Sequence, residues 1–141
     1  MNPSFGPVVL VDSNVLIDVL TEDPRWFAWS SEILSAAADR AVLSIDPIIY
    51  AEVSIGFETI EDLERALPHE GFRRMHLPTE AAFLAGKAFV RYRRAGGARR
   101  SPLPDFFIGA HAAVENMTLL TRDAGRYRSY FPGLRIVAPD A

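Results

Sequence analysis

Short hydrophobic runs alternate with longer amphipathic segments along the whole chain. The short runs are typical of buried strands, and the longer segments carry apolar residues at helical spacing. This alternation predicts an α/β domain with a central, mostly parallel sheet flanked by helices on both faces. Strands are expected at 8–11, 41–45, 72–77, 118–121 and 134–137, and helices from about Asn14, over 24–39, from Pro47, over 60–67, over 78–95, from Pro104, and briefly after Asp123.

Local signals mark the ends of two of these helices. Asp46 followed by Pro47 is typical of an N-cap and a first helical residue. Gly96 and Gly97 mark the end of the long helix before them, and residues 96–104 are expected to form a mobile loop. The aromatic segment around Trp26 can serve either the core or a groove for a partner.

Composition narrows the class of protein. The 141 residues predict one domain over 1–141, and hydrophobic residues make up 49% of them. The absence of cysteine excludes disulfides, thiol catalysis and thiolate zinc sites, and it is compatible with a reducing compartment. The segment MNPSFGPVVLV has no basic leader and too short an apolar run for a signal peptide or a membrane span. We therefore expect a cytoplasmic protein without membrane attachment.

Charge is unevenly distributed. Formal net charge is −3, but residues 91–128 contain eight arginines and three acidic residues, a local charge of +5. Such a basic stretch can face phosphate groups or form an ordinary solvated surface, and its position relative to a site decides between the two.

Four carboxylates fall where a parallel sheet gathers functional groups. Asp12 and Asp123 follow expected strands, so they belong at the carboxyl edge where open α/β sheets bind ligands. Glu52 and Asp105 lie in early turns of helices that must pack on that sheet. Each residue alone is also compatible with a helix cap, but the four together predict a site.

A cluster of this kind needs compensation for its charge. Two carboxylates about 4 Å apart repel by about 4 kcal/mol at an effective dielectric of about 20, which is large beside a total stability of roughly 5–15 kcal/mol. Protons or cations must neutralise the cluster; Lys87, the only lysine, lies mid-helix, although Arg122 can contribute. Oxygen donors without thiolates or paired histidines favour Mg²⁺ or Mn²⁺ over zinc. Such an ion activates water and stabilises charge on a phosphoryl group.

Several other chemistries lack their motifs. No G-x-x-x-x-G-K-[ST] or G-x-G-x-x-G sequence is present, which argues against P-loop and dinucleotide sites. A phosphoaspartyl phosphatase needs an acid where Asn14 stands. A receiver domain needs a lysine after a late strand, but the only lysine, Lys87, lies in the expected helix 78–95. No G-x-S-x-G elbow exists for acyl transfer.

The ordered segments VLVDSNVLID, PIIYAEV, LPDFFIGAHA and LLTRD resemble those of PIN-domain nucleases, and the size resembles that of VapC toxins from bacterial toxin–antitoxin pairs. The resemblance covers residues 8–137. It implies a parallel sheet flanked by helices and metal-dependent hydrolysis of RNA phosphodiesters. It makes Asp12 and Asp105 the principal ligands of Mg²⁺ or Mn²⁺, Glu52 a ligand or water-positioning base, and Asp123 an outer or second-metal ligand.

The same resemblance extends to neighbouring polar residues. Asn14 and Thr121 match positions that orient the acids, although a cap and a strand-end hydroxyl are equally ordinary roles for them. Asp18 is expected on a solvated helix surface. The histidines are scattered without ligand spacing and are expected at packing or surface positions: His69, His76 and His111.

RNA and protein partners complete the expectation. Arginines near the acidic cluster are candidate phosphate contacts with little sequence information, and single-stranded RNA suits a narrow acidic groove. The resemblance implies a small VapB-like antitoxin and a homodimer. The candidate RNA contacts are Arg93, Arg94, Arg99, Arg100, Arg122 and Arg126.

The leading hypothesis is therefore a metal-dependent endoribonuclease that acts as a toxin. Three alternatives stay open: a housekeeping PIN-domain nuclease of RNA processing, a catalytically silent PIN-like binding module, and a metal-dependent phosphatase of small phosphoesters. A small upstream reading frame separates the first two, and a chromogenic monoester tests the last.

Overall fold

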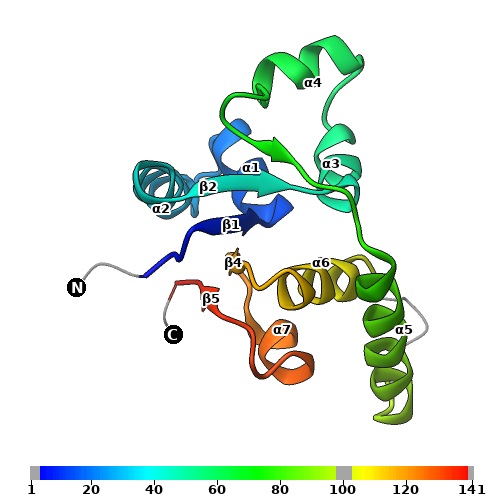
Figure 1. The fold of residues 1–141 in the computed structure, drawn as a ribbon. Helices are drawn as coiled ribbons and strands as arrows, with labels where there is room; N and C mark the ends of the chain where they lie inside the picture. The colour runs from blue at the N-terminus through cyan, green and yellow to red at the C-terminus, as the bar shows by residue number, and fades with distance from the viewer. Residues whose placement is uncertain (1–3, 98–102, 140–141) are drawn as a thin grey trace.

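The computed structural model describes residues 4–97 and 103–139, and its sheet is parallel throughout (Figure 1). The strand order is β3-β2-β1-β4-β5, so β1 and β4 lie side by side at the centre although more than 100 residues separate them. The α/β prediction is confirmed. The strands are β1 (Val8–Val11), β2 (Val42–Ile45), β3 (Arg73–Arg74), β4 (Thr118–Leu120) and β5 (Ile136–Val137).

The helices cover both faces of this sheet. Helices α1 and α2 pack on each other, whereas α6 packs on α5, α7 and β4. The chain adds β2 and β3 on one side of β1 and then returns to add β4 and β5 on the other side. Because parallel crossovers are right-handed, this return places the two groups of helices on opposite faces. The helices are α1 (Ser13–Leu20), α2 (Phe27–Arg40), α3 (Pro47–Ser54), α4 (Ile60–Ala66), α5 (Thr79–Arg94), α6 (Leu103–Val114) and α7 (Gly125–Tyr130).

Side-chain caps begin three of the helices. Asp12 caps α1, Thr59 caps α4, and Asp46 caps α3 with Pro47 in its first turn, as predicted. Helix α2 begins three residues later than expected. The carboxylate of Asp23 accepts hydrogen bonds from the next backbone N–H groups, which closes a separate turn before the helix.

Edge elements are shorter than the sequence indicated. The strand expected at 72–77 is paired only at Arg73–Arg74, because it is an edge strand beside the last two residues of β2. The last strand shortens in the same way, from 134–137 to Ile136–Val137. Helix α5 ends as predicted before Gly96, which has a φ of +90°. Most of the loop expected at 96–104 lies outside the described residues.

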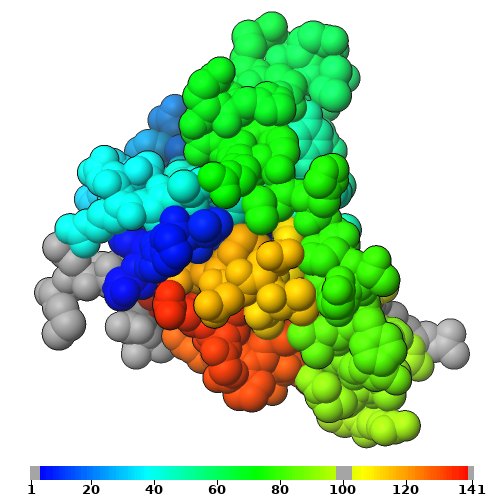
Figure 2. Space-filling model, viewed as in Figure 1, coloured from blue at the N-terminus to red at the C-terminus, as the bar shows by residue number. Residues whose placement is uncertain are grey.

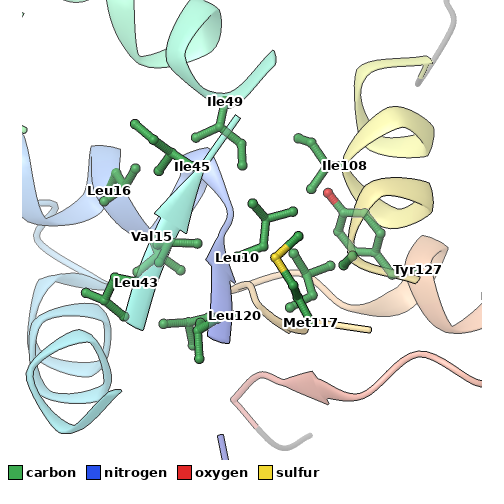
Figure 3. Packing of buried hydrophobic residues seen from close by; sticks show 14 of the residues in the cluster. Leu10, Val15, Leu16, Leu43, Ile45, Ile49, Ile108, Met117, Leu120 and Tyr127 are labelled. Carbon is green, nitrogen blue, oxygen red and sulfur yellow. The ribbon is translucent and has the colours of Figure 1, made fainter. Parts of the chain in front are cut away.

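The core lies between the sheet and the two helical layers (Figure 3). Leu10 and Leu119 of the central strands are fully buried, as are Ile49 of α3 and Ile108 of α6. Burying each such side chain stabilises the fold by roughly 1.5–3 kcal/mol.

The segments of α4 and α5 project from the rest of the molecule (Figure 2), and both regions carry exposed apolar side chains. Ile55 is 86% exposed and Ile60 is 62% exposed beside α4, and Phe83 on α5 is 67% exposed. Within residues 4–97 and 103–139, no helix is both long enough and apolar enough to cross a membrane.

Candidate active site

The carboxyl ends of β1 and β4 build the centre of the site. Asp12 directly follows β1 and Thr121 follows β4, and the backbone N–H of Asp12 donates to the carbonyl of Leu120 at 2.8 Å. This pairing holds the two strand ends together, so the Thr121 hydroxyl donates to Asp12 Oδ2 at 2.8 Å.

Asp12 is a buried carboxylate held by neutral donors. Its side chain accepts from the backbone N–H of Ser13 at 2.7 Å and from the Tyr127 hydroxyl at 2.9 Å, in addition to Thr121. Burial raises the pKa of Asp12 to about 6, although these hydrogen bonds oppose the rise. The residue is 3% exposed.

Glu52 and Asp105 approach from helices α3 and α6. The Ser13 hydroxyl donates to Glu52 Oε1 at 2.7 Å, and Arg126 Nη1 donates to Asp105 Oδ2 at 2.9 Å. Both carboxyls are partly buried, and burial is the main cause that raises the pKa of each. The negative charge of Asp105 also raises the pKa of Asp12 and of Glu52. Asp105 is therefore close enough to act electrostatically on both of the other acids.

Asp123 stands at the rim. It is exposed, its backbone N–H donates to the Thr121 hydroxyl at 3.2 Å, and its charge contributes to the raised pKa of Asp105. Within the described ranges 4–97 and 103–139, no three acidic or histidine side chains stand close enough to form a ready metal centre. Asp105 instead bonds Arg126, and Glu52 bonds Ser13.

The polar residues predicted beside the acids connect α1 to the end of β4. Asn14 donates through Nδ2 to the Thr121 hydroxyl at 3.2 Å and accepts from the backbone N–H of Arg122 at 3.1 Å. Thr121 accepts from Asn14 and donates to Asp12, so one hydroxyl links both residues.

The expectation of a solvated Asp18 is wrong. Asp18 is 1% exposed and binds the Arg122 guanidinium through both oxygens, at 2.7 and 3.0 Å. Ser30 donates to the same carboxylate at 2.8 Å, and Arg122 lies 5.4 Å over the Trp26 ring. Asp18 follows Asn14 by one helical turn, and that face of α1 turns inward.

A second buried pair joins the two helices that carry Asp105 and Glu52. His111 Nδ1 of α6 lies 2.8 Å from Oδ2 of Asp46, and neither side chain is exposed. Asp46 also caps α3, so the pair fixes α3 against α6. Sequence reasoning gave His111 a packing or surface position, which is consistent with its burial, but gave it no partner. His69 contacts Glu64 at 3.1 Å, and His76 is exposed.

The predicted RNA-contact arginines divide into three groups. Arg93 and Arg94 are exposed in the last turn of α5. Arg126 bonds Asp105, and Arg122 bonds Asp18. Arg99 and Arg100 lie outside the described residues.

Tyr127 of α7 was missed by the sequence reasoning. It is 2% exposed, lies in α7 four residues after Asp123, and donates to Asp12. Its closeness in sequence to the last acid was the available signal.

Comparisons with known proteins identify the family and agree with the fold. The family model of the PIN domain matches residues 9–131. No curated protein matches the chain in sequence.

Solved structures share the fold at low sequence identity. The chain is similar to VapBC2 from Rickettsia felis bound to a promoter DNA fragment, with a TM-score of 0.72, 19% identity, and coverage of 94% of this chain and 99% of that chain. For VapBC-1 from nontypeable Haemophilus influenzae the TM-score is 0.69, with 21% identity and coverage of 93% and 97%. For DNA-bound VapBC from Salmonella typhimurium these values are 0.65, 23%, 94% and 98%. Because the family model spans most of the sequence, the chain belongs to the PIN domain family.

Proposed function

We propose that this PIN domain protein is a metal-dependent endoribonuclease that hydrolyses RNA phosphodiester bonds as the toxin of a toxin–antitoxin pair. The observation that carries the proposal is a group of carboxyls with raised pKa values at the carboxyl edge of the sheet, in which the charge of Asp105 acts on Asp12 and Glu52, and that of Asp123 acts on Asp105. Carboxyls with raised pKa values in one cluster are typical of a functional site. Residues 1–141 are taken as one nuclease domain.

The donor chemistry fits a hard divalent cation. Carboxylate oxygens are the ligands that Mg²⁺ and Mn²⁺ prefer, and a cation relieves the repulsion that helps to raise the pKa of Asp12. Asp12 and Asp105 are the proposed principal ligands, with Glu52 and Asp123 as further or second-metal ligands. When bound, the ion lowers the pKa of water and stabilises charge on the phosphate.

Residues around the proposed cation orient its ligands, and one of them, Arg126, changes its partner. Thr121 fixes Asp12 through a hydroxyl, and Asn14 in turn supports Thr121. Glu52 is the candidate group for positioning the attacking water. Arg126 bonds one oxygen of Asp105, and we propose that it exchanges this carboxylate for an RNA phosphate when Asp105 binds a cation.

Arginines support RNA as the substrate, and Arg126 contacts the acidic cluster directly through Asp105. Arg93 and Arg94 are exposed on α5 and are proposed as phosphate contacts together with Arg126. The guanidinium of Arg122 is engaged with Asp18, so its proposed contribution is limited to the exposed part of its side chain. Single-stranded RNA fits best, because its backbone bends into a confined site.

A protein partner is proposed on two grounds. The similar solved structures are VapBC complexes, and exposed apolar residues such as Ile55 and Phe83 offer surface for contact. We propose a small VapB-like antitoxin, a homodimer and a cytoplasmic location. A housekeeping nuclease is the alternative, and a neighbouring small reading frame whose product binds this chain distinguishes the toxin from it.

The test is cleavage of a defined single-stranded RNA by purified, partner-free protein. Wild type is assayed with Mg²⁺, with Mn²⁺ and with chelator, beside Asp105→Asn and the exposed control Asp39→Asn. We expect metal-dependent cleavage that is lost in Asp105→Asn and retained in Asp39→Asn. Tight RNA or partner binding without cleavage supports the silent binding module, and hydrolysis of a chromogenic monoester with intact RNA supports the phosphatase.

A further inference from the structure

Tyr127 places a phenol hydroxyl inside the acidic cluster. Its ring lies beside Ile108 of α6, and its hydroxyl points away from α7 (Figure 3). The residue is 2% exposed, and its hydroxyl donates to Asp12 Oδ2 at 2.9 Å. A buried tyrosine hydroxyl needs a polar partner, and here that partner is a proposed metal ligand.

The donors around Asp12 divide unequally between its two oxygens. Oδ2 accepts from Thr121 at 2.8 Å and from Tyr127 at 2.9 Å. Oδ1 accepts the backbone N–H of Ser13 at 2.7 Å, whereas the Ser13 hydroxyl lies 3.5 Å away and gives its proton to Glu52 at 2.7 Å. Each carboxylate oxygen has about two acceptor sites, so Oδ2 is filled and Oδ1 retains capacity.

A glycine on α6 allows the ring to reach this position. Gly109 lies one helical turn after Asp105, and a Cβ there would stand 2.6 Å from Phe131 Cε2 and 3.0 Å from Tyr127 Cδ1. Helix α6 therefore accepts the two rings only where it has no side chain.

We infer that Tyr127 is a positioning residue of the proposed metal site: its hydroxyl occupies Asp12 Oδ2 together with Thr121 and leaves Oδ1 for the cation. The inference rests on the proposed function. Residues that hold a metal ligand in place contribute about 10–100-fold to metal affinity. Tyr127 does not contact the substrate in this role; it acts through Asp12.

The experiment measures Mn²⁺ affinity directly, by the paramagnetic resonance signal of free Mn²⁺, with metal-free protein and no RNA. Tyr127→Phe keeps the ring against Gly109 and removes the hydroxyl. Tyr130→Phe is the matched control, because it removes the same group from the same helix in a ring that packs on Phe106 at 5.1 Å. Thermal unfolding of all three proteins monitors the fold.

We expect Tyr127→Phe to bind Mn²⁺ about 10–100-fold more weakly, with Tyr130→Phe unchanged and with similar melting temperatures for both variants. Wild-type Mn²⁺ affinity in Tyr127→Phe overturns the inference and leaves the proposed nuclease intact. Equal losses in both variants also overturn it, because they indicate a general effect of α7. A wild-type protein that binds no Mn²⁺ removes the metal-dependent function, and the inference falls with it.

Discussion

Two buried aspartates at helix α1 are treated differently by the fold. Asp18 is 1% exposed, and the Arg122 guanidinium meets both of its oxygens. Asp12 is 3% exposed, but its close donors, at 2.7 to 2.9 Å, are one backbone N–H and two hydroxyls, all neutral. Burial correspondingly raises the pKa of Asp12 to about 6.

The difference separates a structural acid from a candidate catalytic one. Burying a charge is costly unless an opposite charge or strong donors compensate it. At Asp18 the chain provides the cation itself. At Asp12 it provides orientation without full charge compensation, which leaves the site suited to a cation from solution. Substitutions at Arg122, Asp12, Gly109 and Arg126 test this contrast.

The largest expected effect is on the paired side of the comparison. Arg122→Gln leaves the Asp18 carboxylate buried and without its cation, which is expected to lower the free energy of unfolding by about 3–5 kcal/mol. Urea denaturation at neutral pH measures the loss. Arg128→Gln, an exposed arginine on α7, is the control and is expected to change stability little.

The double variant Asp18→Asn with Arg122→Gln sharpens this result. It removes both charges, so we expect it to recover part of the stability that Arg122→Gln loses. A loss below about 1 kcal/mol in Arg122→Gln contradicts the view that Asp18 depends on its internal cation.

The next prediction concerns the pH dependence of stability at Asp12, the buried aspartate without an internal cation. The pKa of Asp12 is raised from 3.8 to about 6 in the folded protein, so its contribution to stability is full below pH 4 and is lost as pH rises through about 6. The shift corresponds to about 3 kcal/mol. Metal-free wild type should therefore lose stability relative to Asp12→Asn between pH 4 and pH 7.

Denaturation of both proteins across this pH range measures the difference, with the other titrating groups common to both. A difference that stays constant with pH contradicts the assignment of the raised pKa to Asp12. Saturating Mn²⁺ at pH 7 is expected to restore the stability of the wild type, because a cation favours the ionised carboxylate. The stability of Asp12→Asn should change little.

The contrast also explains how far the sequence predicts this molecule. Strands such as 8–11 are predictable because a fully buried strand is a continuous apolar run. The segment 72–77, FRRMHL, has only three apolar residues among six, and the extent of its pairing depends on a neighbour, β2, that its own residues do not specify.

The candidate site divides in the same way. Asp12 is predictable from its place after a strand, because parallel strands end at one edge, whereas Thr121 was expected beside it only from the resemblance. The pairing of Asp18 with Arg122 and that of His111 with Asp46 join residues 104 and 65 positions apart. Only the packing of helices on the sheet determines such contacts. The position of Tyr127 depends further on the space at Gly109, which the rings of Tyr127 and Phe131 fill.

A smaller effect is expected at Gly109, where the neutral donors of Asp12 can be disturbed without a change of charge. Gly109→Ala introduces a Cβ within 3.0 Å of both Phe131 and Tyr127. We expect a loss of about 1–3 kcal/mol in unfolding free energy together with weaker Mn²⁺ binding. Gly86→Ala is the matched control, since nothing lies within 4 Å of its Cβ and alanine favours the helix. Equal stability changes in both variants contradict the close packing of α6 and α7.

The smallest effect on stability is expected at Arg126, the internal cation of Asp105. The two side chains are 42% and 35% exposed, so the pair contributes under about 1 kcal/mol to folding. Arg126 nevertheless bonds one oxygen of a proposed metal ligand and places a positive charge beside it. Arg126→Gln should therefore bind Mn²⁺ a few-fold more tightly, roughly the equivalent of that weak pairing energy.

The same substitution should act oppositely on RNA. If Arg126 binds a phosphate after Asp105 takes the metal, its loss raises the KM for single-stranded RNA and lowers the salt slope of binding by about 0.7. Mn²⁺ titration and RNA binding at several salt concentrations measure the two effects separately, with Arg128→Gln again as the control on the same helix. Tighter metal binding without a change in the salt slope means that Arg126 acts on Asp105 and does not bind an RNA phosphate. A weaker affinity for Mn²⁺ instead means that Arg126 supports the ligand rather than competing for it, and the division between internally paired and externally compensated acids then does not extend to Asp105.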